Sequence, residues 1–445
     1  MVATRRKPPG PKGQLLAGCM YDFARRRLDF LTDCAQKYGD LCTFRFGPKR
    51  VYLISHPDLI EHVLVTDARH YIKHFGARNY MPVLGNGLVT SEGDFWLRQR
   101  RLAQPAFLRN RLADYAPIMV GLTEKMLGDW HDGQPVDVHA EMSRLTSAIA
   151  LKTLFDLDAG AERDAYTETL REAFQLLSAR FGHLLRPPEW VPTPGNLRLR
   201  RAVRKLHGMV DEFIRQCRAR KVPGQDLMSR LIHARDEDGS RMTETQLRDE
   251  AMTLYLAGHE TTALTLSWTW YLLAQHPRVE DKLVAEWTAV LRGRAPTWDD
   301  LPQLSYTEHV ITEAMRLYPP VYVIGREPMD DRPLGDYMVR RGSTVFMSQW
   351  VTHRDGRFYE APLEFRPERW AEGLAKRLPK YAYFPFGGGP RVCIGNGFAM
   401  VEAVLLLATI GRQYRFTLEP EPPVDFELGI TLLPRDGIPA VLRRR

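Results

Sequence analysis

Apolar residues recur at helical spacing through most of the middle of the chain. From Phe95 to about Gly293 their period is about 3.6 residues, which predicts a series of helices interrupted by prolines at 187–194 and at Pro277. Thr243 and Gln246 have the spacing of a capping box, and the helical pattern continues from there to Pro277. The pattern therefore predicts one helix of about thirty residues, roughly 45–50 Å long, which is enough to cross a domain.

The segment before this region predicts extended structure first and a helix afterwards. Residues 8–14 (PPGPKGQ) cannot be helical and are expected to form an extended lead-in. Residues 40–55 contain two alternating runs around a GPKR turn, which is the pattern of a β-hairpin. His56, Pro57 and Asp58 then open a helix, and the glycine-rich residues 79–94 are expected to be a loop.

The last third of the chain predicts short strands, an irregular stretch and a final helix. The helix that contains EAMRLYPP must stop at Pro319 and Pro320, and strands are expected at 321–328 and 336–348. Residues 355–392 are mostly irregular, and an apolar helix follows from about 394 to 411. No repeat and no Gly/Ser linker divides the chain, so it is expected to form one domain, mainly α with a small β portion.

Composition leaves this prediction unchanged. The chain is 44% hydrophobic and 26% charged, which is ordinary for a globular protein. No window reaches the roughly 18 consecutive apolar residues of a membrane-spanning helix. Residues 1–12 are basic and proline-rich, so we expect neither a secretory signal nor a membrane anchor there. A cytoplasmic, monomeric protein is expected, with residues 1–445 as a single domain and no fused reductase.

Charge and cysteine content narrow the possible partners. The formal net charge is +8, but the basic residues are dispersed and have no zinc spacing beside them, so nucleic-acid binding is not expected. An acidic protein partner and a plain solvated basic surface both fit. The five cysteines show no paired spacing, which argues against a disulfide framework. Four are expected to be small buried hydrophobic residues, namely Cys19, Cys34, Cys42 and Cys217.

The fifth cysteine lies in the most distinctive segment of the chain, FGGGPRVCIG at 386–395. Its three glycines allow positive φ angles and a close approach of the backbone to a flat ligand. The positive end of the helix that follows favours a thiolate at Cys393, and a thiolate below haem iron favours cleavage of the oxygen–oxygen bond. Arg391 could then pair with a haem propionate. The alternative is a glycine-rich turn with a buried cysteine; a phosphate loop is excluded because no Lys-Ser/Thr follows the glycines.

The long helix contains an unusual step at 257–262, AGHETT. A glycine there costs about 1 kcal/mol relative to alanine, and adjacent threonines are poor helix formers. A small residue leaves room for a diatomic ligand, and a threonine hydroxyl that turns away from its own helix opens a notch for water. Glu260 can then relay protons. Taken alone, the step is better explained as an irregular buried helix with a satisfied polar pair.

The cysteine segment resembles the haem-binding signature of the cytochrome P450 family, Phe-x-x-Gly-x-Arg-x-Cys-x-Gly. Its fixed positions are met by Phe386, Gly389, Arg391, Cys393 and Gly395. The resemblance implies the cytochrome P450 fold, in which haem b lies between the long central helix and the cysteine loop with the last helix. It makes Cys393 the iron ligand and places Phe386, Arg391 and Gly395 at the cofactor.

The step in the long helix is similar to the oxygen-activation motif of the same family, Ala/Gly-Gly-x-Asp/Glu-Thr-Thr. That similarity assigns Thr261 and Glu260 as the catalytic residues that handle oxygen and protons, and it places Ala257 beside the haem. It also implies that Leu256 and Ala257 face the substrate. His259 is expected to be a partly exposed residue and not a ligand.

Three charged residues match the Glu-Arg-Arg triad of the family. Glu313 and Arg316 are three apart and share one face of a predicted helix, and Arg369 follows in FRPERW. By this resemblance they form a buried network that fixes the irregular stretch before the cysteine loop. Their role would be structural, and removing one member should cost several kcal/mol through the uncompensated charge.

Further residues are assigned to the propionates and to the substrate. Trp96 and Arg100 match the Trp-x-x-x-Arg pair of the family, which engages a propionate, and Arg326 stands where the family often has another propionate-binding arginine. Val323 and Ile324 are expected to line the substrate pocket together with the helix residue assigned above. The candidate pocket segments are mainly aliphatic and aromatic, which suggests an apolar substrate.

The resemblance implies a monooxygenase that inserts one atom of O2 into an apolar small molecule, either fatty-acid-like or terpenoid and polycyclic. Electrons would come indirectly from NAD(P)H through separate proteins, a ferredoxin with its reductase or a flavodoxin-type donor, which a basic surface could steer. Arg180 or His183 could hold a substrate carboxylate. The alternative class is a haem-thiolate gas or ligand sensor or an inactive relative, which would not need the acid–threonine pair.

Overall fold

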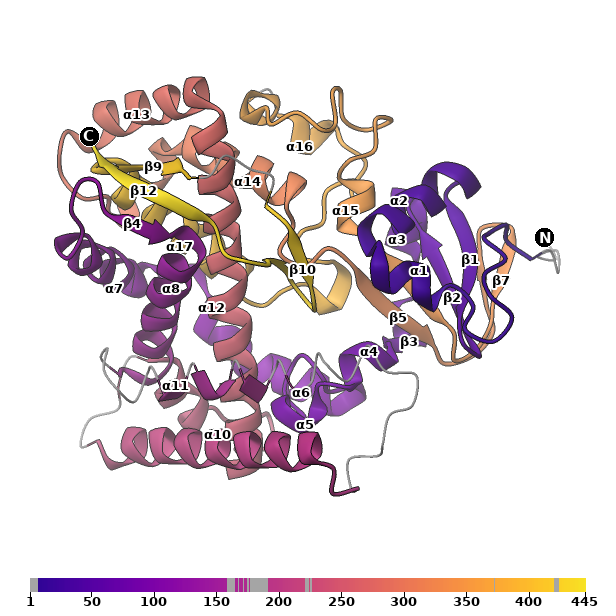
Figure 1. The fold of residues 1–445 in the computed structure, drawn as a ribbon. Coiled ribbons are helices and arrows are strands. Elements are labelled where there is room, and N and C mark those ends of the chain that lie inside the picture. The colour runs from indigo at the N-terminus through magenta and orange to yellow at the C-terminus, as the bar shows by residue number, and fades with distance from the viewer. Residues whose placement is uncertain are drawn as a thin grey trace.

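The computed structural model describes residues 7–157, 191–220, 226–371, 373–419 and 424–445, with Gly224 and some residues between 165 and 176. Helices dominate this part of the chain (Figure 1). They are α1 (Met20–Arg25), α2 (Arg27–Tyr38), α3 (Pro57–Glu61), α4 (Phe75–Arg78), α5 (Met81–Leu84), α6 (Gly93–Ala103), α7 (Arg109–Gly128), α8 (Val138–Phe155), α10 (Pro194–Ala219), α11 (Leu227–His233), α12 (Glu244–Gln275), α13 (Pro277–Leu291), α14 (Ser305–Leu317), α15 (Gln349–Thr352), α16 (Leu374–Arg377) and α17 (Asn396–Gly411).

The strands are short and form small sheets. They are β1 (Leu41–Phe46), β2 (Lys49–Ile54), β3 (Tyr71–Lys73), β4 (Pro135–Asp137), β5 (Ile324–Pro328), β6 (Arg332–Leu334), β7 (Tyr337–Val339), β8 (Thr344–Met347), β9 (Tyr414–Leu418), β10 (Phe426–Leu428), β11 (Leu432–Pro434) and β12 (Pro439–Arg444). The largest sheet has the order β1-β2-β8-β5-β3, with β2 and β8 parallel; a second has the order β4-β12-β9. The predicted fold class, mainly α with a small β portion, is confirmed.

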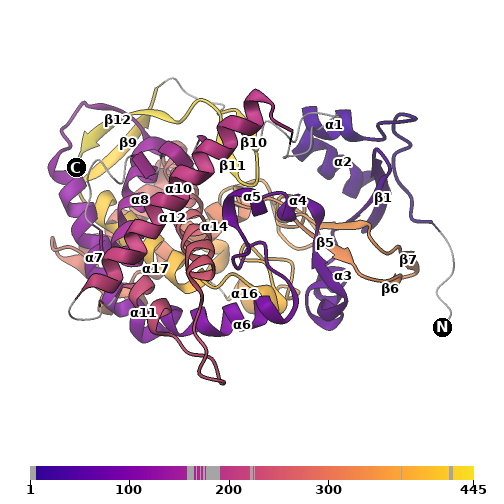
Figure 2. The same cartoon turned by 90° about the horizontal axis from the view of Figure 1, so that it is seen from below.

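Helix α12 runs through the middle of the helical part, and α8, α10, α14 and α17 pack on it (Figures 1 and 2). It begins with the predicted capping box, in which the Thr243 hydroxyl accepts from the Gln246 N–H and the Gln246 side chain accepts from the Thr243 N–H. Its 32 residues end just before Pro277, as expected. Within the described chain, no helix combines the length and hydrophobicity that crossing a bilayer requires.

Two hydrophobic cores meet along α12. Its N-terminal half, up to Tyr255, belongs to a cluster built with α8, α10 and α11. From Ala263 onward the same helix belongs to a second cluster built with α7, α14 and α17. The AGHETT step at 257–262 therefore lies between the two cores, where the helix is free of tight apolar packing.

Several local predictions need correction. The expected loop at 79–94 contains a one-turn helix, α5, because Pro82 occupies a first-turn position. The region expected to be predominantly helical also contains β4, which pairs with β12 from the other end of the chain. The strands β9 to β12 were not predicted, and the last helix begins at Asn396, two residues later than expected.

Candidate functional site

The backbone of the cysteine loop is shaped by contacts with the rest of the protein. Gly387 and Gly389 have φ angles of 71° and 66°, in the left-handed region that only glycine adopts freely. A Cβ on Gly389 would lie 1.8 Å from the Leu64 carbonyl oxygen, and one on Gly388 would lie 2.2 Å from the Tyr381 ring. The sequence suggested that the glycines allow a flat ligand to approach. In the structure, Gly388 and Gly389 are needed first for close packing against Tyr381 and Leu64.

The thiol of Cys393 is exposed, whereas the four other cysteines are buried, as predicted. Its N–H donates to the Phe386 carbonyl over 3.0 Å, which closes the loop before α17. Surrounding protein nevertheless raises the pKa of this thiol by desolvation, against the lowering effects of the Gly395 N–H and the Arg100 guanidinium. A sulfur that is reachable yet desolvated faces an internal space. The protein alone therefore does not favour the thiolate form of Cys393, although the sequence had suggested that it would. Binding to a metal would have to favour it.

Three cations gather around one carboxylate next to this loop. Arg391 is bonded to Glu92, and its guanidinium lies 4.4 Å from the centre of the buried Trp96 ring. The backbone N–H of Lys73 donates to the Glu92 carboxylate over 2.6 Å. The Lys73 ammonium donates to two loop carbonyls. Arg326 makes one hydrogen bond among the described residues, to the adjacent Gly325 carbonyl.

Burial and mutual repulsion act on these cations. Desolvation, followed by repulsion from Arg391, lowers the pKa of Arg326 to about 10 and that of Lys73 to about 7. Arg100 is close by, where it donates to the Val392 carbonyl over 2.9 Å, and desolvation lowers its pKa as well. We call Lys73, Arg100, Arg326 and Arg391 the cation cluster. These side chains bring more positive than negative charge to one end of the site, and Glu92 is the carboxylate bonded to them, which fits a ligand with carboxylates such as haem.

The AGHETT step presents small residues to the space between the two cores. Ala257 is exposed although its helix is largely buried, and a Cβ added to Gly258 would meet nothing within 4 Å. The Thr261 hydroxyl donates to the Ala257 carbonyl over 2.6 Å. The expected notch, with this hydroxyl turned away from its own helix, is therefore wrong for this conformation. A threonine satisfies its hydroxyl in this way unless another acceptor is present.

The acid and the histidine of the step have different surroundings. Desolvation raises the pKa of Glu260, and the Thr431 hydroxyl, which donates to it over 2.5 Å, opposes this. His259 is 6% exposed and stacks on Tyr255 with ring centres 4.7 Å apart. The prediction of a partly exposed histidine is wrong, because that side of α12 is covered by α8. Burial lowers the pKa of His259 to about 4, so it stays neutral.

The residues assigned to substrate are partly buried and aliphatic. Leu256 packs against the N-terminal core of α12. Val323 immediately precedes β5 and Ile324 begins it, three and two residues before the cation Arg326, and Ile324 is 3.9 Å from the position of a Cβ on Gly387. Strand β5 thus joins this apolar group to the cation cluster. Arg180 and His183 lie outside the described residues.

The three charged residues of the predicted triad lie in contact. The Glu313 carboxylate accepts from Arg316 and from Arg369, each over 2.9 Å, and from the Trp370 indole over 2.9 Å. The side chains of Glu313 and Arg316 are fully buried. All five N–H groups of Arg316 have acceptors, two on Glu313 and three on backbone carbonyls at 353, 362 and 364. This network ties α14 to the irregular segment that leads to the cysteine loop.

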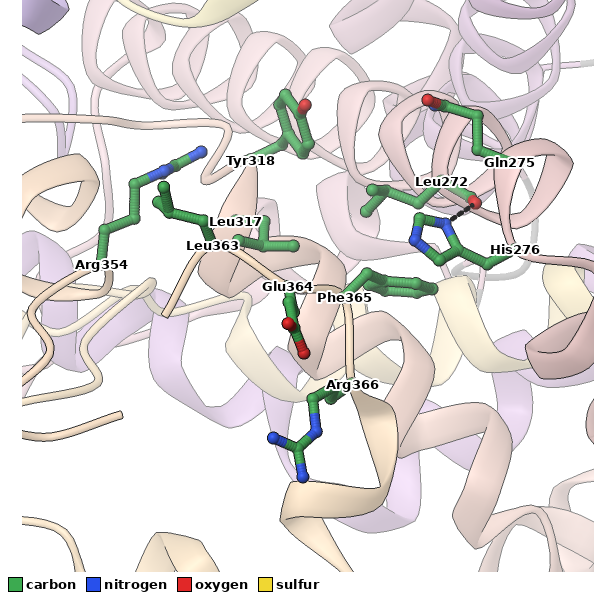
Figure 3. Close-up of a pocket in the computed structure, with 10 residues that line it drawn as sticks. All are labelled: Leu272, Gln275, His276, Leu317, Tyr318, Arg354, Leu363, Glu364, Phe365 and Arg366. Atoms are coloured by element: carbon green, nitrogen blue, oxygen red, sulfur yellow. Dashed lines mark hydrogen bonds between the residues drawn. The ribbon is translucent and has the colours of Figure 1, made fainter. Parts of the chain in front are cut away.

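A cavity of about 660 Å³ lies elsewhere, between the C-terminal ends of α12 and α14 and residues 363–366 (Figure 3). Arg354 points toward Tyr318 in this view. Its guanidinium lies 3.3 Å from the Trp350 ring centre, and burial lowers its pKa to about 9. None of the residues assigned to the haem or to the substrate lines this cavity, so it is separate from the cysteine site.

Three residues of the site were missed in the sequence. Lys73 and Glu92 belong to no motif, although a lysine in a short strand before the Trp-x-x-x-Arg pair could have suggested a further cation. Thr431 lies 171 residues from Glu260 in the chain, and no local signal predicts their contact.

Comparison with known proteins gives a consistent result. The cytochrome P450 family model matches residues 8–438. The chain is 37% identical to cyclooctatin synthase of Streptomyces melanosporofaciens, over 96% of this chain and 95% of that protein. It is 35% identical to pentalenene oxygenase of Streptomyces avermitilis, over 92% and 91%. The crystal structure of the cytochrome P450DA heme domain superposes with a TM-score of 0.89 at 26% identity, covering 99% and 98% of the two chains.

Proposed function

This chain belongs to the cytochrome P450 family of haem-thiolate monooxygenases, and on that premise we propose that it oxidises a polycyclic, terpenoid-like hydrocarbon. Haem and O2 are the family's cofactor and co-substrate. Bound haem supplies the chemistry by which O2, two electrons and two protons place one oxygen atom in the substrate and release the other as water. The single observation that carries the proposed haem site is the exposed thiol of Cys393 beside the cation cluster.

The residues that would hold the haem suit both its iron and its propionates. Cys393 offers the sulfur ligand, and Phe386 and Gly395 flank it in the loop. Charge-assisted bonds from Arg326, Arg391, Arg100 and Lys73 suit two propionates, because Arg326 and Arg100 donate to neutral backbone carbonyls and Glu92 is the carboxylate that pairs with Arg391. The Trp96 indole would complete the same end of the site.

Glu260 and Thr261 are proposed to manage protons on the other side of the site. Burial raises the pKa of the Glu260 carboxyl, which makes it a better carrier of a proton that it can release to an acceptor. The Thr261 hydroxyl would leave its bond to the Ala257 carbonyl and pass the proton on from its Oγ1 atom. Ala257 and Gly258 leave this face of α12 open to small molecules.

The choice of substrate class rests on the lining and on the relatives. Leu256, Val323 and Ile324 offer only hydrocarbon surface. One relative at 35% identity is a pentalenene oxygenase, and its name specifies an unsaturated hydrocarbon. Of the two classes that the sequence left open, we therefore favour the terpenoid or polycyclic one over fatty acids. Electrons would come from NAD(P)H through a ferredoxin with its reductase or a flavodoxin, attracted by the net charge of +8.

A ligand screen on the purified haem protein tests this proposal. Polycyclic hydrocarbons should displace water from the ferric iron and shift the Soret band, whereas fatty acids of similar size should not. Addition of ferredoxin, its reductase and NADPH should then give an oxygenated hydrocarbon. Selective binding of fatty acids would overturn the substrate class. Absence of the thiolate-type carbon monoxide spectrum, or of any product with every donor, would overturn the monooxygenase assignment and favour a sensor or an inactive relative.

A further inference from the structure

The tight turn between β10 and β11, residues 429–431, reaches the acid of the α12 step. Thr431 is 6% exposed, and its hydroxyl donates to the Glu260 Oε1 atom over 2.5 Å. Such a distance is that of a short hydroxyl–oxygen hydrogen bond. The carboxyl of Glu260 therefore has a specific partner from a distant part of the chain.

The turn itself is fixed by contacts that do not involve Glu260. The Leu432 N–H donates to the Pro320 carbonyl over 2.9 Å, and the Trp268 indole donates to the Leu432 carbonyl over 2.9 Å. On the other side of the turn, the Tyr322 hydroxyl donates to the Gly429 carbonyl over 2.8 Å. Because both flanks are held, the turn determines where the Glu260 carboxyl lies, and not the reverse.

The middle residue of the turn has an apolar environment. Ile430 packs against the same hydrophobic cluster as Leu256, the residue assigned to the substrate side of α12. One short turn thus adjoins, through Ile430, the hydrophobic cluster on which Leu256 packs, and it bonds the proposed proton donor through Thr431. A glutamate side chain has several rotatable bonds, so an anchored partner for one oxygen also restricts the direction of the other.

We propose that Thr431 is the positioning residue for Glu260, and that the β10–β11 turn couples substrate contact at Ile430 to the orientation of the proton-donating carboxyl. The proposal rests on the monooxygenase function proposed above. With Thr431 in place, the Glu260 carboxyl is held in one orientation, from which it passes its proton to Thr261. Without the Thr431 hydroxyl, the Glu260 carboxyl rotates freely and proton transfer is slower. More of the electrons then reduce O2 to hydrogen peroxide.

Infrared difference spectra of the ferric haem protein test the first half of this proposal. The Glu260 carboxyl band is assigned by its loss in Glu260→Gln. Thr431→Val, which keeps the shape of the side chain and removes the hydroxyl, should shift this band, and Thr431→Ser should restore it. Thr153→Val is the matched control, since Thr153 is also buried and its hydroxyl donates only to its own helix. An unshifted band in Thr431→Val, or a shift as large in Thr153→Val, would overturn the contact.

Electron balance tests the second half. In the reconstituted system, Thr431→Val should release roughly fivefold more peroxide per NADPH than the unchanged protein, as expected for loss of one ordinary hydrogen bond. Thr431→Ser and Thr153→Val should not differ from it. A shifted infrared band with unchanged peroxide release would overturn the positioning role. A protein that makes no product at all refutes the proposed function instead, and the infrared result still decides whether the Thr431–Glu260 contact exists.

Discussion

Two groups of buried charge in this molecule are built in opposite ways. In the Glu313–Arg316–Arg369 triad, every N–H group of Arg316 has an acceptor supplied by the protein. In the cation cluster, the Arg326 side chain makes its one hydrogen bond among the described residues to the Gly325 carbonyl, and burial with repulsion lowers its pKa to about 10. The triad is therefore electrostatically complete in the folded chain. For the cation cluster we propose that the haem propionates supply the anionic partners.

This difference separates stability from binding. Buried charges that are paired within the chain contribute to holding the fold once they are in place, because removing one leaves its partner unpaired. Buried charges that lack partners weaken the empty protein and favour a ligand that brings the opposite charge. The comparison thus predicts that the same kind of substitution has opposite effects at the two places.

The largest effect is expected at the sulfur. Cys393→Ser should abolish the red-shifted carbon monoxide spectrum of thiolate-bound haem, because a neutral hydroxyl cannot replace an anionic sulfur. Cys217→Ala, at a buried free thiol, should retain the spectrum. Absorption spectra of the reduced, carbon monoxide-treated variants provide the measurement. A normal spectrum in Cys393→Ser would show that the haem ligand does not lie in this loop.

The next largest effect is expected in the triad. Glu313→Gln should lower the free energy of unfolding by about 3–5 kcal/mol, since it leaves two buried guanidinium groups without their carboxylate. Glu368→Gln is the control, because its partner Lys282 is 57% exposed and such pairs contribute about 1 kcal/mol or less. Urea unfolding of the haem-free proteins compares them. Equal losses in both variants would contradict the view of the triad as a buried, complete network.

Substitution in the cation cluster should have the opposite effect on the stability of the haem-free protein. Arg326→Gln should leave the haem-free protein as stable as before or more stable, while it weakens haem retention roughly 10-fold to 100-fold through the lost bond to a propionate. Transfer of haem to apomyoglobin measures retention, and urea unfolding measures stability. Arg316→Gln, the same change in the triad, should destabilise the haem-free protein strongly. A similar loss of stability in Arg326→Gln and Arg316→Gln would contradict the distinction between the cation cluster and the triad.

The smallest effect is a dependence on pH. Burial and repulsion from Arg391 lower the pKa of Lys73 to about 7 from 10.5. Between these values the unfolded chain holds a proton that the folded chain lacks, so folding stability rises with pH, by at most about 1.4 kcal/mol per unit. The penalty is complete below pH 7 and is relieved as pH rises toward 10.5. Lys73→Met should remove this rise in urea unfolding of the haem-free protein; a parallel slope in both proteins would contradict it.

Local signals in the sequence predicted the elements that depend on local structure. The capping box at Thr243 and the proline at 277 set both ends of α12 because each acts on its own backbone. Strands β9 to β12 escaped prediction because they have three to six residues each, and β12 is stabilised by β4, about 300 residues away. Strands of this kind are determined by their partners and not by their own propensity.

The site divides in the same way. Sequence motifs brought Cys393, Arg391 and the AGHETT step to attention, because spacing within a loop or helix is visible in the chain. They did not reveal that Thr261 bonds to Ala257, that Thr431 holds Glu260, or that His259 is covered by α8. These facts depend on which distant side chain occupies the neighbouring space, and packing alone decides that.

The contact of Gly389 with Leu64 has a consequence for engineering this enzyme. Leu64 belongs to a π-helical turn in the N-terminal part of the chain, and its carbonyl leaves no room for even a methyl group on the sulfur-bearing loop. Consider a chimera in which the first hundred residues come from a relative. Any misfit in that turn would displace the loop that carries Cys393. Designs that graft new entrance segments should keep residues 62–66 native and vary the chain beyond them.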